Sequence, residues 1–129
     1  MKTQLGLLGF LLLPLLLTAG EETGFIQIFD GTLKNWDGDP VYWKAENDVL
    51  IGEVRPDTLL KRNSFIIWRG GETKNFELKL EYRVSDLGNS GINYRSIEVP
   101  GLKWALQGYQ DDIDGRDQWS GQNYEERGR

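Results

Sequence analysis

Carboxylate, amide and guanidinium side chains recur at every second position in three short stretches of this chain. The polar members are Glu81 and Arg83, Asn93 and Arg95, and Gln110, Asp112 and Asp114. Because an extended strand points alternate side chains to the same side, each set is expected to share one face. A carboxylate can take up a proton as a general base. All three types of group can hydrogen-bond the hydroxyl groups of a ligand.

The composition excludes several catalytic mechanisms. The chain has no His and no Cys, which excludes Ser-His and Cys-His nucleophiles and leaves zinc without its usual ligands. Catalysis would then depend on carboxylates, Arg, Lys, Tyr and amides, or on a hard cation held by oxygen atoms. The sequence requires no cofactor. Its acidic cluster suits either a solvated loop or a calcium-like divalent cation, and consists of Asp111, Asp112, Asp114 and Asp117.

The elements that must position these groups are strands. Residues 76–84 alternate strictly between an apolar face and a charged face, which predicts a strand with one side in the core. A Gly-Asn-Ser-Gly turn at 88–91 follows, and residues 91–97 continue with Asn93 and Arg95 on one side. The pattern predicts a β-hairpin whose polar side forms a cleft wall.

The rest of the chain has the same character, with short apolar stretches divided by turn residues and no sustained 3.6-residue period. The predicted strands are 25–29, 41–45, 49–54, 64–69, 75–84, 91–97 and 103–113. This spacing indicates an all-β domain built as a two-sheet sandwich or jelly roll. Most of the five Trp residues are expected in the core, while Trp104 and Trp119 are the candidates for stacking on a sugar ring.

The first twenty residues differ from the others, with a short basic start, an apolar run and small residues before Glu21. They are predicted to be a secretory signal peptide, so that residues 21–129 form one exported domain, periplasmic or secreted. The apolar run is shorter than the roughly 20 residues of a spanning helix and contains Pro14, so no permanent membrane span is expected.

Charge also excludes one class of partner. Without Lys2, the predicted mature chain carries 15 − 1 = 14 Lys and Arg against 20 Asp and Glu, a net charge of −6. Nucleic acid binding depends on cationic groups that neutralise phosphates, so it is not expected here. At the other end, the chain stops in a polar stretch at Arg129 with no closing strand, which predicts a domain truncated at an open sheet edge.

Four local motifs occur in a recognisable order: FDGTLKNW at 29–36, FELKLEYR at 76–83, NSGINYR at 89–95, and GYQDDID at 108–114 followed by SGQNYEER at 120–127. In order and spacing, residues 25–129 resemble the 3-keto-disaccharide hydrolase domain family. The resemblance implies a concanavalin-like jelly roll whose concave sheet binds a small saccharide. It also implies cleavage of glycosides that are already oxidised to a ketone at C3.

The resemblance further implies a set of cleft residues: Glu81, Arg83, Asn89, Arg95, Gln110, Asp112, Tyr124 and Glu125. A C3 ketone acidifies the C2 proton, so a carboxylate can remove it and the C1 substituent can leave. Asp112 is the preferred base, or an oxygen ligand if a metal is present, with Glu81 as the substitute. Arg83 and Arg95 are expected to hold the ketone or enolate, while Asn89, Gln110 and Tyr124 bind hydroxyl groups.

Other interpretations stay open. Glu81 with Arg83 is often a solvated surface pair, and Gly91 is explained equally well by a turn that needs positive φ. The domain is alternatively a saccharide-binding module without turnover, or an interaction domain.

Two positions depart from the family pattern. Asp111 would point to the apolar side, so either the strand ends there or its register differs. Asn47-Asp48 replaces an Asp-Gly turn and predicts a less favourable hairpin.

Overall fold

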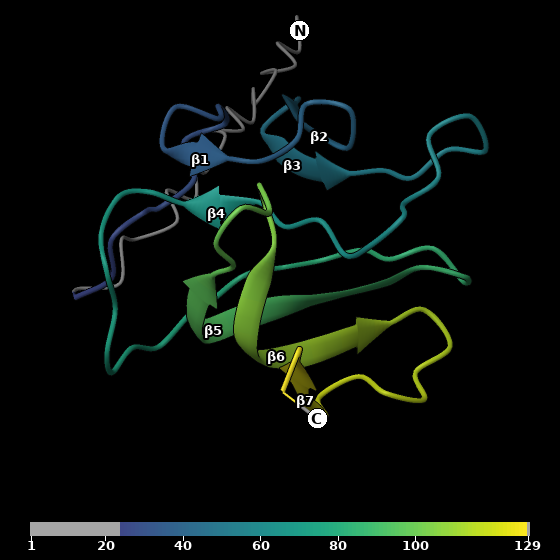
Figure 1. Cartoon of the computed structure of the whole chain (residues 1–129). Coiled ribbons are helices and arrows are strands. Elements are labelled where there is room, and N and C mark those ends of the chain that lie inside the picture. The colour runs from purple at the N-terminus through teal and green to yellow at the C-terminus, as the bar shows by residue number, and fades with distance from the viewer. Residues whose placement is uncertain (1–23, 129) are drawn as a thin grey trace, which may run out of the picture.

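The computed structural model describes residues 24–128, so the predicted signal peptide lies outside the described part. Within that part the chain has seven strands and no helix (Figure 1). The strands are β1 (Trp36–Asp37), β2 (Trp43–Glu46), β3 (Val49–Gly52), β4 (Ile67–Trp68), β5 (Asn89–Glu98), β6 (Leu106–Asp114) and β7 (Asn123–Glu126). No helix that could cross a membrane is found among these residues.

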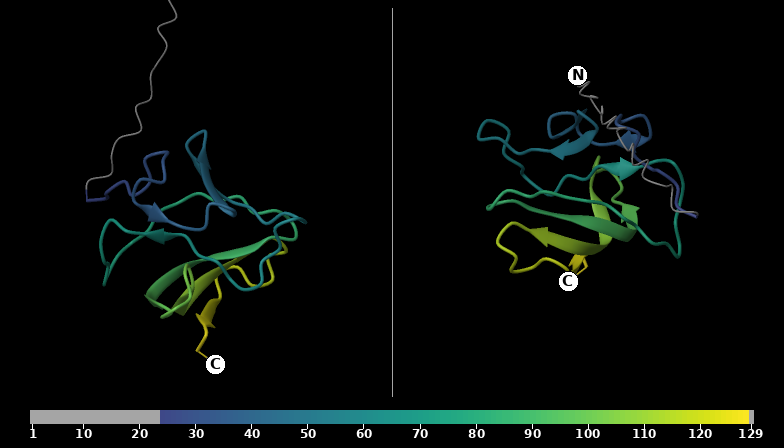
Figure 2. Two further views of the ribbon diagram at one scale, coloured as in Figure 1. Left: turned by 45° about the horizontal axis from the view of Figure 1, so that its top comes forward. Right: turned by 180° about the vertical axis from the view of Figure 1, so that it is seen from behind.

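All strand pairs are antiparallel and form three small sheets, β1-β4, β2-β3 and β5-β6-β7. Figure 2 shows the first two sheets grouped together and the three-stranded sheet set apart from them. The all-β prediction is confirmed, and the arrangement is consistent with a β-sandwich. The strand bounds differ from those predicted, since residues 25–29 form no strand and 64–69 pair only at Ile67–Trp68.

The β2-β3 hairpin turns on Asn47 and Asp48, the pair that the sequence marks as less favourable. Both residues have positive φ, 52° and 59°, as a two-residue type I′ turn requires. The short polar side chains of Asn and Asp tolerate this left-handed backbone better than other non-glycine residues do. The hairpin therefore forms in the register that joins Glu46 to Val49.

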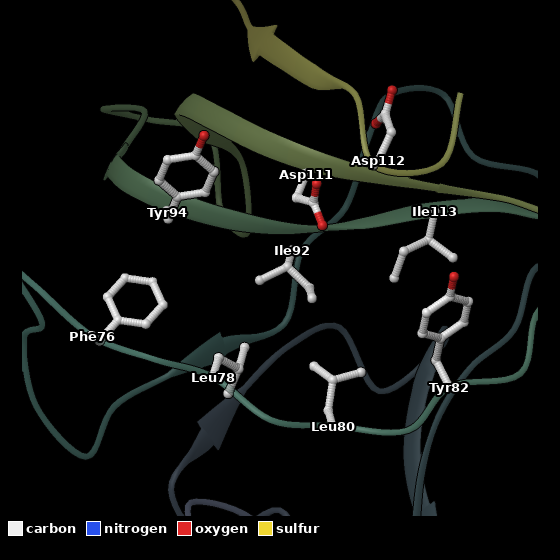
Figure 3. A pocket seen from close by; sticks show the side chains of 10 residues that line it. Phe76, Leu78, Leu80, Tyr82, Ile92, Tyr94, Asp111, Asp112 and Ile113 are labelled. Carbon is white, nitrogen blue, oxygen red and sulfur yellow. The ribbon is translucent and has the colours of Figure 1, made fainter. Parts of the chain in front are cut away.

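The predicted strand 75–84 is wrong in one respect, because this segment pairs with no described strand. It is extended and lies over one face of β5 and β6, where its apolar side chains point toward Ile92 and Ile113 (Figure 3). The turn that precedes β5 is centred on Asp86 and Leu87 and closes with the Gly88 N–H donating to the Ser85 carbonyl at 2.7 Å. The segment thus covers the sheet instead of extending it.

The enclosed core is small. Among the described residues, the buried apolar side chains are Ala105, Leu106 and Ile113, all on or next to β6. The Trp residues expected in the core are only half-buried at positions 36, 43 and 68. Of the two stacking candidates, Trp104 is also half-buried and Trp119 is exposed. Half-burial of these large rings still removes much apolar area from water, so they supply a substantial part of the packing.

An ion-pair network ties the β1-β4 sheet to the three-stranded sheet. Arg69, which follows β4, donates hydrogen bonds to Asp37 at 2.7 Å and to both carboxylate oxygens of Glu98, at 2.5 and 2.9 Å. Trp104 adds a hydrogen bond from Nε1 to Asp37 at 2.8 Å. Hydrogen bonds from Arg69 lower the pKa of Glu98 and, together with that from Trp104, the pKa of Asp37.

This network predicts a pH-dependent contribution to stability. Because both carboxyl pKa values are lower in the folded state, the stabilisation is complete above the ordinary carboxyl pKa of about 4 and is lost as the pH falls below it. The Arg69→Gln variant is expected to have a lower urea midpoint than the wild type at neutral pH. As the pH falls through the lowered pKa values of Asp37 and Glu98, the two midpoints should converge. A constant difference across this range would contradict the assignment.

Candidate functional site

The candidate site is built on β6, the central strand of the β5-β6-β7 sheet. Gln110 and Asp112 lie two positions apart on one face, and Gln110 Nε2 donates a hydrogen bond to Asp112 Oδ1 at 2.6 Å. Gln110 is only 7% exposed, and the side chain of Asp112 is partly accessible. A buried amide therefore fixes the orientation of a carboxylate that solvent still reaches.

The strands on either side of β6 add polar groups to this face. Asn93 on β5 and Tyr124 on β7 both lie directly opposite Gln110 in the sheet register. Tyr124 is 46% exposed, whereas Asn93 Nδ2 is buried and has no hydrogen-bond partner among the described residues. A buried amide donor without a protein partner is costly, so a water molecule, an ion or a bound ligand is the kind of group that would satisfy it.

Gly91, which has no side chain, leaves the space that the Gln110 side chain occupies. It pairs with Asp112 across the sheet, and a Cβ atom there would lie 2.5 Å from Gln110 Cγ and 2.7 Å from the Asp111 carbonyl oxygen. Its φ is not positive, so the glycine is not explained by a left-handed turn. The close approach of the Gln110 side chain explains it instead.

Arg95 does not share the face of Asn93, which corrects the alternation predicted for 91–97. The β5-β6 register is irregular between Tyr94 and Ile97, and Arg95 has a φ of 49°. An extra residue in one strand shifts the side chains that follow it to other directions. Arg95 consequently lines a hollow on the other side of the sheet with Tyr94 and Tyr109.

The remaining residues of the predicted cleft lie elsewhere. Glu81 and Arg83 are exposed on the 76–84 segment, outside the three-stranded sheet. Asn89 is exposed at the start of β5, opposite Asp114, and Glu125 on β7 lies opposite Tyr109. Of the predicted set, the structure brings together Gln110, Asp112 and Tyr124.

The two candidate stacking Trp residues have different surroundings. Trp104 is held by its hydrogen bond to Asp37, and the Lys103 ammonium lies 4.0 Å from its ring centre, so the side chain is engaged in the structural network. Trp119 is 52% exposed in the connection between β6 and β7. Only Trp119 presents an accessible ring.

The hollow on the opposite face was not predicted as a site. It is an open hollow of about 520 Å³, in which Tyr94 and Tyr109 stack at 6.0 Å between ring centres. Tyr94 donates a hydrogen bond to Asn123 at 2.7 Å, and Lys74, Asn75, Phe76 and Arg95 complete the lining. The sequence did contain a signal for this hollow. Tyr109 alternates with Gln110 and Tyr94 with Asn93, so both rings are expected on the face that points away from Asp112.

The four aspartates of the acidic cluster, Asp111, Asp112, Asp114 and Asp117, do not converge as a set. In the part of the chain that the structure describes, no three acidic side chains are grouped so that they could hold a metal. Asp114 accepts a hydrogen bond from the Gln118 N–H at 3.0 Å. β6 continues through the exposed Asp111, whose carboxylate points toward Ile92, whereas that of Asp112 points away from the apolar side chains (Figure 3).

Of three comparisons with known proteins, the one with family models gives a match. No curated protein and no solved structure matches this chain. A family model described as the 3-keto-alpha-glucoside-1,2-lyase-like domain matches residues 24–129, which include all seven strands and the polar face around Asp112. The chain therefore belongs to the 3-keto-alpha-glucoside-1,2-lyase-like domain family.

Proposed function

We propose that this domain cleaves glycosides of 3-keto sugars on the polar face of the β5-β6-β7 sheet, with Asp112 as the general base. The observation that carries the proposal is the carboxylate of Asp112, held by the buried Gln110 amide and still open to solvent. The family name supports the class of reaction, since a 1,2-lyase eliminates across C1 and C2. The predicted signal peptide supports action outside the cytoplasm.

The reaction proceeds in two stages. Asp112 takes the C2 proton, which the adjacent C3 ketone acidifies, and the bonding electrons form an enolate. The enolate then re-forms the ketone and a C1=C2 double bond as the C1–O bond breaks, and the leaving oxygen takes a proton from Asp112 or water. Addition of water across this double bond completes a net hydrolysis. No step requires a metal or an oxidant.

The surrounding groups supply binding and orientation. Gln110 keeps the carboxylate directed at the substrate, because its amide hydrogen bond restricts rotation of Asp112. Tyr124, which is exposed across the sheet from Gln110, donates to a sugar hydroxyl group. The unpartnered amide of Asn93 becomes satisfied when the substrate or an ordered water molecule reaches it.

The decisive measurement is product analysis after incubation with a 3-keto-disaccharide and, in parallel, with its unoxidised parent. Consumption of the ketone alone is expected, because only the ketone lowers the barrier to C2 deprotonation. Solvent deuterium should appear at C2 of the product when water adds back. Cleavage of both sugars at similar rates would contradict this mechanism, as would the absence of any product.

A second candidate is a saccharide-binding module without turnover. The Tyr94 and Tyr109 pair favours it, since stacked rings beside Arg95 and Asn123 offer an aromatic platform with hydrogen-bonding groups at its border. This candidate predicts saturable binding of unoxidised sugars with a change in fluorescence and no product. Loss of that binding in a Tyr109→Ala variant would locate it in the hollow.

A further inference from the structure

Arg95 lines the hollow beside Tyr94 and Tyr109, which we call the tyrosine hollow, because of a bulge in β5. Two residues of β5, Arg95 and Ser96, lie opposite the single residue Gly108 of β6. Arg95 has a φ of 49°, a left-handed backbone that an arginine adopts only at a cost in free energy. Bulges often redirect a side chain beside a binding site, and strained residues cluster at such sites. The bulge is therefore a first indication that the tyrosine hollow binds a ligand.

The charged side chains that line the tyrosine hollow are both cationic. They are Lys74 and Arg95, and both are exposed. Among the residues that the structure describes, no carboxylate lines this hollow; Glu125 lies opposite Tyr109 in the sheet register but is not part of the lining. The chain as a whole has a net charge of −5. The local charge of the hollow is thus opposite to that of the chain, which favours an anionic ligand.

The polar groups of the hollow are mainly hydrogen-bond donors. Arg95 and Lys74 carry donors and no acceptor, and the arginine fork matches the two oxygens of a carboxylate. The Tyr94 hydroxyl donates to Asn123 Oδ1 at 2.7 Å, which occupies the side-chain oxygen of Asn123 and leaves its NH₂ group to donate. A set of donors of this kind matches a ligand group that has only acceptors.

The aromatic rings supply the apolar part of the hollow. Tyr94 and Tyr109 are inclined by 29° to each other, and Tyr109 is 40% exposed, so part of its surface is open to a ligand. Phe76 adds a third ring to the lining. Aromatic surface with a few convergent polar groups is typical of small-molecule sites, and about 520 Å³ is within the usual size of such sites.

We propose that the tyrosine hollow binds an acidic sugar, with its pyranose ring against Tyr109 and its carboxylate on Arg95 and Lys74. The inference rests on the second candidate, that this hollow binds a saccharide, and not on turnover at Asp112. It adds the chemical class of the ligand. Because Tyr109 and Asp112 lie on opposite faces of β6, the acidic sugar is held apart from the carboxylate that abstracts the proton.

Calorimetric titration of the purified protein with two matched sugars tests the inference. Methyl β-glucuronide and methyl β-glucoside differ only in the carboxylate at C6, and neither has a C3 ketone. At low ionic strength the glucuronide is expected to bind roughly tenfold more tightly than the glucoside. This preference should shrink at about 1 M salt, where the screening length is only about 3 Å.

Substitutions then locate the site. Arg95→Gln and Lys74→Gln should each reduce the preference for the glucuronide, and Lys74 is an exposed residue outside the strands, so its replacement leaves the sheet intact. Tyr109→Ala should weaken binding of both sugars. Arg62→Gln is the matched control, because Arg62 is exposed and does not line the hollow; it should keep the wild-type preference. Asp112→Asn should also keep it.

Four results would overturn the proposal. Equal binding of the two sugars by the wild type leaves the hollow as a neutral saccharide site only. Acetate that binds as tightly as the glucuronide shows an anion site that does not recognise sugar. A preference that survives both Arg95→Gln and Lys74→Gln belongs to another surface. Loss of glucuronide binding in Asp112→Asn would place the ligand on the opposite face of the sheet.

Discussion

Replacement of Asp112 by Asn is expected to lower the turnover of a 3-keto-disaccharide by about 10²- to 10⁴-fold, the range typical for loss of a general base. The Asn side chain has the same shape, and its oxygen can still accept the Gln110 hydrogen bond that holds Asp112 at 2.6 Å. What it loses is the ability to take a proton from C2. The loss should therefore appear in the rate at saturating substrate, with little change in KM.

Asp111→Asn is the matched control for this experiment. Asp111 is the adjacent residue on the same strand, is also acidic, and points to the opposite side of the sheet toward Ile92 (Figure 3). Its replacement changes the net charge by the same amount and should leave turnover near the wild-type value. If Asp112→Asn were as active as the wild type, or if both variants lost activity equally, the general base would lie elsewhere.

Gly115→Ala is expected to destabilise the fold by about 1 to 3 kcal/mol, as overpacking of a tight contact does. A Cβ atom at Gly115 would collide with the carbonyl oxygen of Ser85 and with the backbone of Asp86. Backbone atoms cannot turn aside as a flexible side chain can. The Gly115 N–H also donates to the Gly88 carbonyl at 2.9 Å, and separation of the two segments would weaken that bond.

The measurement for Gly115 is the urea midpoint, followed by circular dichroism. Leu87→Ala serves as the control, because Leu87 is in the same turn but its side chain is 79% exposed. The control should unfold near the wild-type midpoint. A Gly115→Ala variant with an unchanged midpoint would mean that the 85–88 turn does not rest against the end of β6.

The sequence predicts the local features of this fold well. Alternation places Gln110 and Asp112 on one side and Tyr109 and Asp111 on the other, and the β6 backbone has this arrangement. Strand β6 was expected at 103–113 and spans Leu106–Asp114, a shift at its ends only. Period-two patterns report which face a side chain takes, and that property is set by the strand alone.

The features that the sequence did not predict depend on partners that lie far along the chain. Strict alternation in 76–84 indicates an extended segment with an apolar side, but it does not specify whether that segment extends the sheet beside β5 or covers its face. Arg95 moved away from Asn93 because one extra residue enters β5 opposite Gly108. The same shift separated Arg95 from Asp112 and joined it to the tyrosine pair.

The small enclosed core has a consequence for the thermodynamics of unfolding. The heat capacity change grows with the apolar area that becomes hydrated, and among the described residues only Ala105, Leu106 and Ile113 are apolar side chains with less than a tenth of their surface exposed. The stability curve is accordingly flat, with a shallow maximum and a broad calorimetric transition. Binding of a sugar would steepen it by withdrawing more apolar surface from water.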